Sequence, residues 1–397
     1  MGARVKQLPS LGHRVPYWPL SRFYFFYFAA LGAMLPYWSL FLQRLGFDAE
    51  AIGWLTAIMT CTRIIAPNIW GWLADRTRRR LTVIRLGACL GFIFFLGIFA
   101  AHSFFWLALV IFCYSFFWNA ILAQFEVVTL GHLADQRSSY SLVRLWGSVG
   151  FILAVALIGL VFDYVDILYL PYAIAFLMLS IWLATLGAEE RPLHRSSEQT
   201  AGLLQIVKQP AVIAFFLASF LLQAAHAPYY VFFSIHLENF SYSRALIGQL
   251  WALGVIAEVV IFIYMHRIMR RFSLRHIFII SLAATIARWL MIAFGTQYLA
   301  LLVVAQCLHA FSFGTLHAAA IELVHRYFGG GHAGQGQAMY SASSFGAGAA
   351  GGAILSGYLW DNLGAGITFG FSALASGLAL VVAYIWFNTE QFQKRTG

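Results

Sequence analysis

The stretch GWLADRTRRR, residues 71–80, lies between two long apolar segments and decides the fold. Arginines are concentrated in and just after it, at Arg76, Arg78, Arg79, Arg80 and Arg85. Connections rich in Lys and Arg stay on the cytoplasmic side of a membrane, so this loop is expected in the cytoplasm. An ordinary basic loop would need only the arginines. Gly71 and Asp75 fall in the same ten residues, which favours a more specific role.

Composition places the chain in a membrane. Of its 397 residues, 61% are hydrophobic and only 10% are charged, and the mean hydropathy is +0.77. A soluble domain carries about a quarter charged residues. Twelve apolar stretches are long enough to cross roughly 30 Å of hydrocarbon, and their backbone polar groups must be satisfied within each segment, as in helices. These stretches are 19–43, 51–73, 82–101, 104–131, 142–162, 167–187, 211–236, 245–265, 275–294, 298–323, 336–359 and 365–387.

The distribution of positive charge gives the expected topology. The net charge is +10, but the basic residues cluster in alternate loops, and the loops between them carry only Arg44 and Arg244. This asymmetry predicts a multi-pass protein of the bacterial inner membrane with both termini in the cytoplasm. The expected partners are therefore the lipid bilayer and its anionic headgroups, and not nucleic acid.

Cysteines give no sign of a metal or disulfide framework. The four of them, Cys61, Cys89, Cys113 and Cys307, fall inside the expected spans, and no CxxC pair exists. We expect no disulfide, no metal site and no cofactor.

The chain repeats itself. Shifting the numbering by 195 aligns Ile52-Gly53-x-Leu55 with Ile247-Gly248-x-Leu250. Two similar halves that both enter from the cytoplasm fit two bundles related by an axis along the membrane normal. We therefore predict an all-α membrane protein of twelve transmembrane helices in two pseudo-symmetric six-helix bundles, residues 1–187 and 211–397, joined by a cytoplasmic linker, residues 188–210.

Ionisable residues inside the expected spans are the candidates for chemistry. An ionised group in hydrocarbon costs roughly 2.5 kcal/mol or more, so it normally faces a partner or a water-filled cavity. For Glu322, near a span end, and for His317, a structural role competes strongly. The remaining candidates for substrate binding and coupling are Arg63, Glu126, Arg144, His226, Glu258, Arg288 and His309.

Glu126 and Arg144 are the first choice among these. They lie on consecutive spans joined by a short loop, so they can approach one another. A guanidinium can hold a carboxylate or a pair of sugar hydroxyls with two parallel hydrogen bonds. A substrate that competes for the arginine changes the proton affinity of the acid, which is a minimal mechanism for proton coupling.

Two sets of motifs carry a resemblance to known transporters. The pattern G-x-L-A-D-R-x-x-R-R resembles the loop signature of the major facilitator superfamily, except that Arg78 stands where that family usually has glycine. The resemblance implies a gating role for this loop, with Gly71, Asp75, Arg76, Arg79 and Arg80. RLWGSVGF at 144–151, QAAHAPYY at 223–230, LGVIAEVVIF at 253–262 and CLHAFSFGTLHAAA at 307–320 resemble the 3-phenylpropionic acid transporter family. That family is related to the oligosaccharide:proton symporters such as lactose permease.

The resemblance implies roles for several of the candidates. Arg144 and Glu126 match the pair that holds the sugar in lactose permease, and Arg288 and His309 match two residues of its proton and substrate machinery. One position departs from the pattern: Ser312 replaces the proton-carrying glutamate. Glu258 or Glu126 would then supply the carboxylate, or His309 itself would titrate.

The sequence therefore predicts a secondary active transporter that couples protons to the symport of a small organic acid resembling 3-phenylpropionate. A sugar or nucleoside symporter and a drug or metabolite efflux antiporter are the alternatives. A membrane-embedded enzyme would need a paired nucleophile and base or a metal cluster at one depth, and the sequence offers none, so we expect no enzymatic activity. We also expect a monomer.

Overall fold

The computed structural model describes residues 16–133, 140–190, 202–329 and 332–387, and within these ranges the regular structure is helical. Eleven of the described helices are long and apolar enough to cross a membrane. One of them, residues 333–386, contains a non-helical residue at Gly364 (φ 82°, ψ 172°) that separates two spans. The twelve predicted crossings are confirmed in this way.

The first half of the chain forms six long helices. They are α1 (Tyr17–Arg44), α2 (Ala49–Thr77), α3 (Arg80–Phe95, continued by the 3-10 turn η1, Leu96–Phe99), α4 (Phe104–His132), α5 (Tyr140–Phe162) and α6 (Leu170–Leu186, preceded by η3, Ile167–Tyr169).

The second half is more interrupted. It comprises α7 (Leu203–Val207), α8 (Pro210–Asn239), α9 (Arg244–Arg271), α10 (Leu274–Phe294), α11 (Leu299–Cys307), the π-helix η4 (Ala310–Thr315), α12 (Leu316–Tyr327), α13 (Ala333–Tyr340), the π-helix η5 (Ser341–Gly348) and α14 (Ala349–Trp386). α11, η4 and α12 together make one crossing, and α13, η5 and the start of α14 make another.

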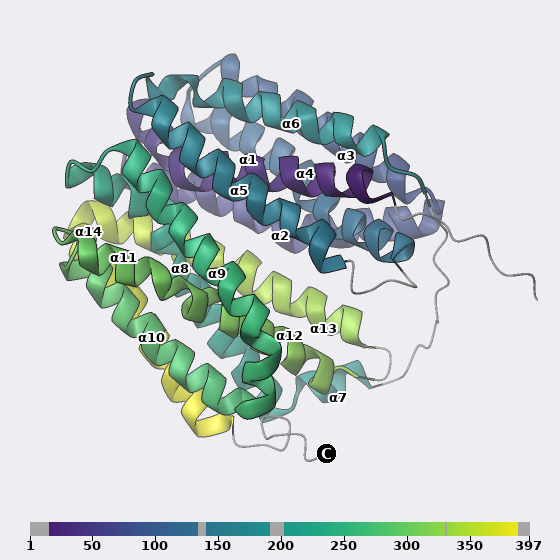
Figure 1. The fold of residues 1–397 in the computed structure, drawn as a ribbon, viewed down its shortest axis with the longest axis vertical. Helices are drawn as coiled ribbons and strands as arrows, with labels where there is room; N and C mark the ends of the chain where they lie inside the picture. The colour runs from purple at the N-terminus through teal and green to yellow at the C-terminus, as the bar shows by residue number, and fades with distance from the viewer. Residues whose placement is uncertain (1–15, 134–139, 191–201, 330–331, 388–397) are drawn as a thin grey trace, which may run out of the picture.

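Figure 1 shows the two halves as separate bundles, α1–α6 in purple to blue and α8–α14 in teal to yellow. We call the side of the molecule that holds the 78–79 turn, the 272–273 turn and the start of α8 the linker side. The side that holds the turns at 45–48, 163–166 and 240–243 is the far side.

The halves meet closely on the far side, where glycines let the helix backbones touch. α5 packs on α9, and α2 packs on α14. A Cβ at Gly53 would lie 2.6 Å from the Ala353 carbonyl oxygen, and one at Gly357 would lie 2.5 Å from that of Ala49. A Cβ at Gly159 would likewise lie 2.5 Å from the Arg244 oxygen. Such small-residue contacts are how membrane helices approach closely.

Local capping fixes where α2 begins and ends. The Asp48 carboxylate accepts a hydrogen bond from the Ala51 amide (2.8 Å) at its start, as an N-cap does. At its end Arg78 adopts the left-handed conformation (φ 54°, ψ 22°). That conformation at a helix C-terminus favours glycine because a Cβ is unfavourable there. The departure of Arg78 from the superfamily loop pattern is thus a strained backbone position.

Replacing Arg78 with glycine should therefore stabilise the protein. We expect Arg78→Gly to relieve about 1 kcal/mol of left-handed strain and to raise the midpoint of thermal unfolding in detergent. Arg79→Gly is the matched control, because Arg79 is also exposed but has φ −122°, so glycine there relieves no left-handed strain and should not raise the midpoint by the same amount. Equal midpoints for the two variants would contradict this account of the turn.

Candidate substrate and coupling site

The structure brings Glu126 of α4 and Arg144 of α5 together. The Arg144 Nε lies 3.9 Å from the Glu126 Oε1, and the two side chains are 31% and 35% exposed. That separation exceeds a hydrogen bond, so the pair is loose and accessible. A ligand can insert between the two groups without first breaking a tight bond.

Aromatic rings of α1 hold the Arg144 guanidinium in place. Its central carbon lies 3.9 Å from the centre of the Phe28 ring and 5.4 Å from that of Tyr24. Attraction between a cation and a ring face contributes roughly 0.5–2 kcal/mol, more when water is excluded. The Tyr24 hydroxyl is itself fixed by donating to the Thr129 hydroxyl (3.1 Å). Arg144 is thus positioned by aromatic rings, without a tight ion pair to Glu126.

Arg63 of α2 is the third charged candidate of the first half. It is partly exposed, and the described residues give it neither an ion pair nor a hydrogen-bond partner. Its helix, α2, packs against α14 and η5 of the second half, so Arg63 is carried by a helix at the boundary between the bundles.

The second half contains a carboxylate and an imidazole in a similar arrangement. The His309 Nε2 lies 3.7 Å from the Glu258 Oε2, and the two side chains are 8% and 18% exposed. His309 also stacks on Phe313, with ring centres 5.6 Å apart. It immediately precedes the π-helix η4, and π-helical turns are frequent at functional sites.

Arg288 of α10 is fully buried. Its Nε donates to the Ala305 carbonyl (3.1 Å), and its Nη1 donates to the Ser312 hydroxyl (3.0 Å). Its central carbon lies 4.2 Å from the Tyr229 ring centre and 4.4 Å from that of Trp289. The other terminal nitrogen, Nη2, has no hydrogen-bond partner in the part of the chain that the structure describes. No carboxylate among the described residues forms an ion pair with Arg288.

His226 of α8 lies beside this arginine. Its Nδ1 lies 2.8 Å from the Leu222 carbonyl oxygen, and its ring meets Trp289 edge-on at 5.0 Å. Its Nε2, like the His309 Nδ1, is buried without a partner in the described ranges. Buried polar atoms are normally hydrogen-bonded. With the Gln306 Nε2, four buried nitrogens in this region have no partner among the described residues, and they mark a place where a polar ligand or water would fit.

The two groups of residues lie on helices that meet between the halves. Arg144 is on α5 and Glu258 is on α9, and these two helices pack against each other. The pairs Glu126–Arg144 and Glu258–His309 are thus carried by neighbouring helices at the boundary between the bundles. Arg288 and His226 lie deeper in the second half.

The residues of the predicted gating loop contact other parts of the first half. Asp75 pairs with Arg80 (2.5 Å). Arg80 also donates to the Gln124 side chain and, from its backbone N–H, to Glu190. Arg76 lies over the Trp72 ring, and Gly71 faces Gln124. In this conformation the loop ties α2 and α3 to α4 and to the end of α6.

The remaining ionisable residues have local contacts. Glu322 accepts from Arg326 (2.8 Å), one turn away on α12. His317 stacks on Phe313 and lies 3.4 Å from the Tyr340 hydroxyl. Among the described residues, no group of three or more His, Cys, Asp or Glu side chains is arranged to hold a metal ion.

The structure also contains functional residues that were not among the ionisable candidates from the sequence. Tyr229 donates to the Gln306 side chain (2.9 Å), and both are buried beside Arg288. A glutamine in an otherwise apolar span was the available signal for Gln306. On the far side, Asp163 and Asp361 join the two halves, and the signal for them was a GxxxD pattern that occurs at 159–163 and again at 357–361.

Known proteins resemble this chain over most of its length. The model of the MFS_1 like family matches residues 17–371. The probable 3-phenylpropionic acid transporter of Escherichia coli (strain K12) is 31% identical over 87% of this chain and 91% of its own length. The maltose permease of Geobacillus stearothermophilus is 24% identical over 93% of this chain and 94% of its own length.

Solved structures agree in fold. A mutant of the nucleoside transporter NupG superposes with a TM-score of 0.83 at 20% identity, covering 95% of this chain and all of that one. The peptide transporter PepTSo superposes with a TM-score of 0.70 at 12% identity, covering 95% and 98%. At these identities the likeness concerns the fold alone.

Arg288 offers a test of whether this region is built for stability. A buried cation without an acidic partner is costly, and an apolar side chain of similar length is often neutral or stabilising in its place. Ser312 also donates to the His309 carbonyl (3.3 Å), so it keeps a partner. We expect Arg288→Met to unfold in detergent at or above the wild-type temperature. A fall of more than about 3 kcal/mol in stability, the cost of breaking a buried pair, would show that Arg288 has a structural counter-charge.

Proposed function

Because this chain belongs to the MFS_1 like family, and is therefore a secondary transporter of the major facilitator superfamily, we propose that it carries a small organic acid together with protons. The single observation that supports an acid is the charge inside the spans. The candidates include three arginines, Arg63, Arg144 and Arg288, but only two carboxylates, Glu126 and Glu258. One positive charge is therefore left without a carboxylate among these described residues. A monovalent anion satisfies that charge.

Arg144 and Arg288 would bind the substrate carboxylate at different points along the transport path. Arg144 is partly exposed and has a loose partner, so it is suited to first contact with a carboxylate. Arg288 is buried among Tyr229 and Trp289 with one nitrogen unsatisfied, so it is suited to a carboxylate that has left water. The surrounding rings would accept an aromatic or apolar tail. A 3-phenylpropionate-like acid, named by the E. coli relative, fits this arrangement.

Proton coupling would involve the two glutamates. Glu258 lies near His309, on the helix α9 that packs against α5, which carries Arg144, so movement of Arg144 toward a substrate would alter the stability of the Glu258 carboxylate. Ser312, which accepts from Arg288, occupies the position where lactose permease has its acid. Glu258 is therefore our candidate for the coupling acid, with Glu126 and His309 as rivals.

A sugar or nucleoside is the second candidate substrate. The maltose permease relative is similar over nearly the full chain, and a guanidinium beside a carboxylate, as in Arg144 and Glu126, can also hold a pair of hydroxyls. Efflux by antiport uses the same fold and remains a further alternative.

The proposed membrane placement follows the arginine distribution. The loop at 78–80 and the cluster Arg267, Arg270 and Arg271 lie on the linker side, which we assign to the cytoplasm. The far side then faces the periplasm, both termini are cytoplasmic, and the membrane is the bacterial inner membrane. We propose residues 1–187 and 211–397 as the two domains, acting in a monomer.

Uptake of labelled compounds into vesicles tests the substrate class. With an inward proton gradient, we expect accumulation of 3-phenylpropionate-like acids and little of maltose or nucleosides, and collapse of the gradient should stop accumulation. Arg144→Lys should lower uptake at least tenfold, because lysine cannot reproduce bidentate binding.

Arg326→Lys is the matched control for that substitution, since Arg326 pairs with Glu322 on its own helix, and it should transport normally. Accumulation of sugars or nucleosides instead of acids would favour the second candidate. Normal uptake by Arg144→Lys would move the anchor to Arg63 or Arg288.

Glu258→Gln tests the coupling acid. The amide mimics a permanently protonated carboxyl, so we expect loss of uphill accumulation but retained exchange of labelled for unlabelled substrate in preloaded vesicles. Exchange needs no deprotonation, which is why it should survive. Glu322→Gln serves as the control and should do both. Uphill accumulation by Glu258→Gln would exclude Glu258, and the same assay on Glu126→Gln and His309→Gln would then identify the coupling group.

A further inference from the structure

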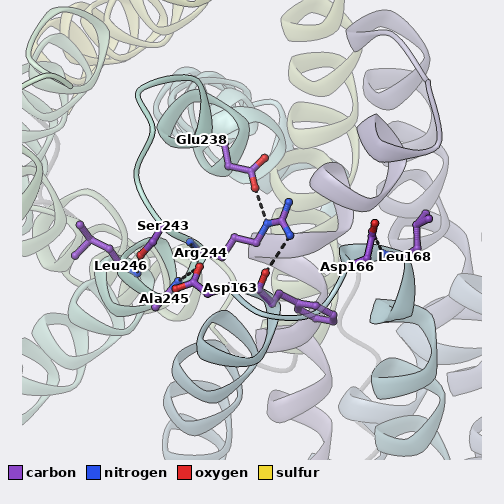
Figure 2. Close-up of polar contacts among 9 residues, drawn as sticks. Asp163, Asp166, Leu168, Glu238, Ser243, Arg244, Ala245 and Leu246 are labelled. Carbon is purple, nitrogen blue, oxygen red and sulfur yellow. Dashed lines mark hydrogen bonds and ion pairs between the residues drawn. The ribbon is translucent and has the colours of Figure 1, made fainter.

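On the far side, the first amides of α9 are capped by a residue of the opposite half. The backbone N–H groups of Arg244 and Ala245 donate to the Asp163 Oδ1 at 2.7 and 3.3 Å. Asp163 directly follows α5, and Figure 2 shows it beside Arg244 and Ala245. The Arg244 side chain adds a second bond between the halves by donating to the Phe162 carbonyl (3.0 Å), and its pairing with Glu238 (2.5 Å) orients it.

The same arrangement occurs in reverse at the start of α2. There the N–H groups of Ala49 and Glu50 donate to the Asp361 carboxylate at 3.3 and 2.8 Å. Asp361 lies on α14, in the second half. Each half therefore supplies one aspartate to a helix start of the other half.

The two contacts are related by the internal repeat. Asp163 ends the segment GLVFD, residues 159–163, and Asp361 ends the segment GYLWD, residues 357–361. In both, the glycine one turn earlier lets the backbone of the capped helix approach, since a Cβ there would lie 2.5 Å from the oxygen of Arg244 or Ala49. At both positions, therefore, a glycine that permits close helix packing is followed one turn later by an aspartate that accepts hydrogen bonds from the other half.

Each helix start also has a cap of its own, so the aspartates of the opposite half take amides that would otherwise face water. Asp48 accepts from Ala51, and Ser243 accepts from Leu246. The first amides of each helix remain for Asp361 and Asp163. The positive end of a helix dipole favours a carboxylate at this place.

We propose that Asp163 and Asp361 are a pair of latches that hold the far side closed, and that both must release when the transporter opens to that side. The bonds that Asp163 and Asp361 accept all join the two halves, so rotation of one bundle against the other breaks them together. Release exposes two carboxylates and two helix starts to water, which can hydrate both. The latches therefore bias the equilibrium between the two access states without contacting the substrate, and the proposal holds for any substrate.

The test measures how often the far side opens, at a place remote from each substitution. Gly248 of α9 meets the α5 backbone at Val155, and Ala252 lies one turn further along the same face of α9. Ala252, and Ala353 on the α2–α14 contact, are 6% and 1% exposed. In the full chain with its four native cysteines changed to serine, a cysteine at either position should react faster with a maleimide when the halves separate. Asp361 variants are read at Ala252→Cys, and Asp163 variants are read at Ala353→Cys, without substrate.

We expect Asp163→Ala and Asp361→Ala each to speed labelling at the remote position roughly fivefold, as loss of a helix cap implies, and the double variant to do so roughly 25-fold, because separate sites add. Asp163→Asn and Asp361→Asn keep an acceptor oxygen and should restore most of the slow labelling. If an alanine variant fails to insert, the serine variant at the same position is used instead. The serine side chain is one bond shorter than that of aspartate, so its oxygen does not reach the amides.

Asp166→Ala is the matched control. Asp166 is an exposed acid three residues from Asp163, but it bonds to Arg44 (2.9 Å) and to the Leu168 amide (3.0 Å) within its own half, and that amide lowers the pKa of its carboxyl. Its variant should label at the wild-type rate. Wild-type labelling in the Asp163 and Asp361 variants would overturn the proposal, and so would asparagine variants that label as fast as alanine, since charge alone would then explain the effect. The assay contains no substrate, so its failure is separate from failure of the proposed transport.

Discussion

An ionised side chain persists inside a bilayer only where a partner charge, a hydrogen bond or water meets it. This constraint organises the middle of the molecule. Glu126 and Arg144 lie together but do not touch closely, Glu258 is next to His309, and Arg288 relies on a carbonyl, a hydroxyl and two aromatic rings. None of these three arrangements is a tight, saturated ion pair. The polar centre is therefore stable enough to insert and incomplete enough to respond to a ligand.

The fold was largely predictable because hydrophobic length and arginine distribution are strong signals. The twelve crossings and the two-bundle architecture follow from them, and the last two crossings are separated by the non-helical Gly364. The approach of Glu126 to Arg144 was predictable because a short loop connects their spans. The pairing of Glu258 with His309 was not, since it depends on how α9 packs against the π-helix η4, and sequence spacing does not give that register.

The functional residues that the sequence did not reveal are neutral polar residues and exposed acids. Gln306 and Tyr229 carry no charge, so a search for ionisable groups passes over them, although they line the surroundings of Arg288. Asp163 and Asp361 lie outside the apolar stretches and read as ordinary loop residues until the halves are placed together. Arg78 is the opposite case: its difference from the superfamily pattern was visible in the sequence, but the reason, a left-handed backbone, appears only in three dimensions.

The π-helix η4 has a consequence for how the centre can be rearranged. It begins just after His309 and contains Ser312, the residue that accepts from Arg288. A π turn holds one more residue than an α turn, and one residue corresponds to about 100° of rotation around a helix axis. If η4 tightened into α geometry, the segment before it would turn relative to the segment after it, and His309 would point away from Glu258 while α12 stayed in place. A local change of winding, without any bundle moving, could therefore disconnect the imidazole from the carboxylate.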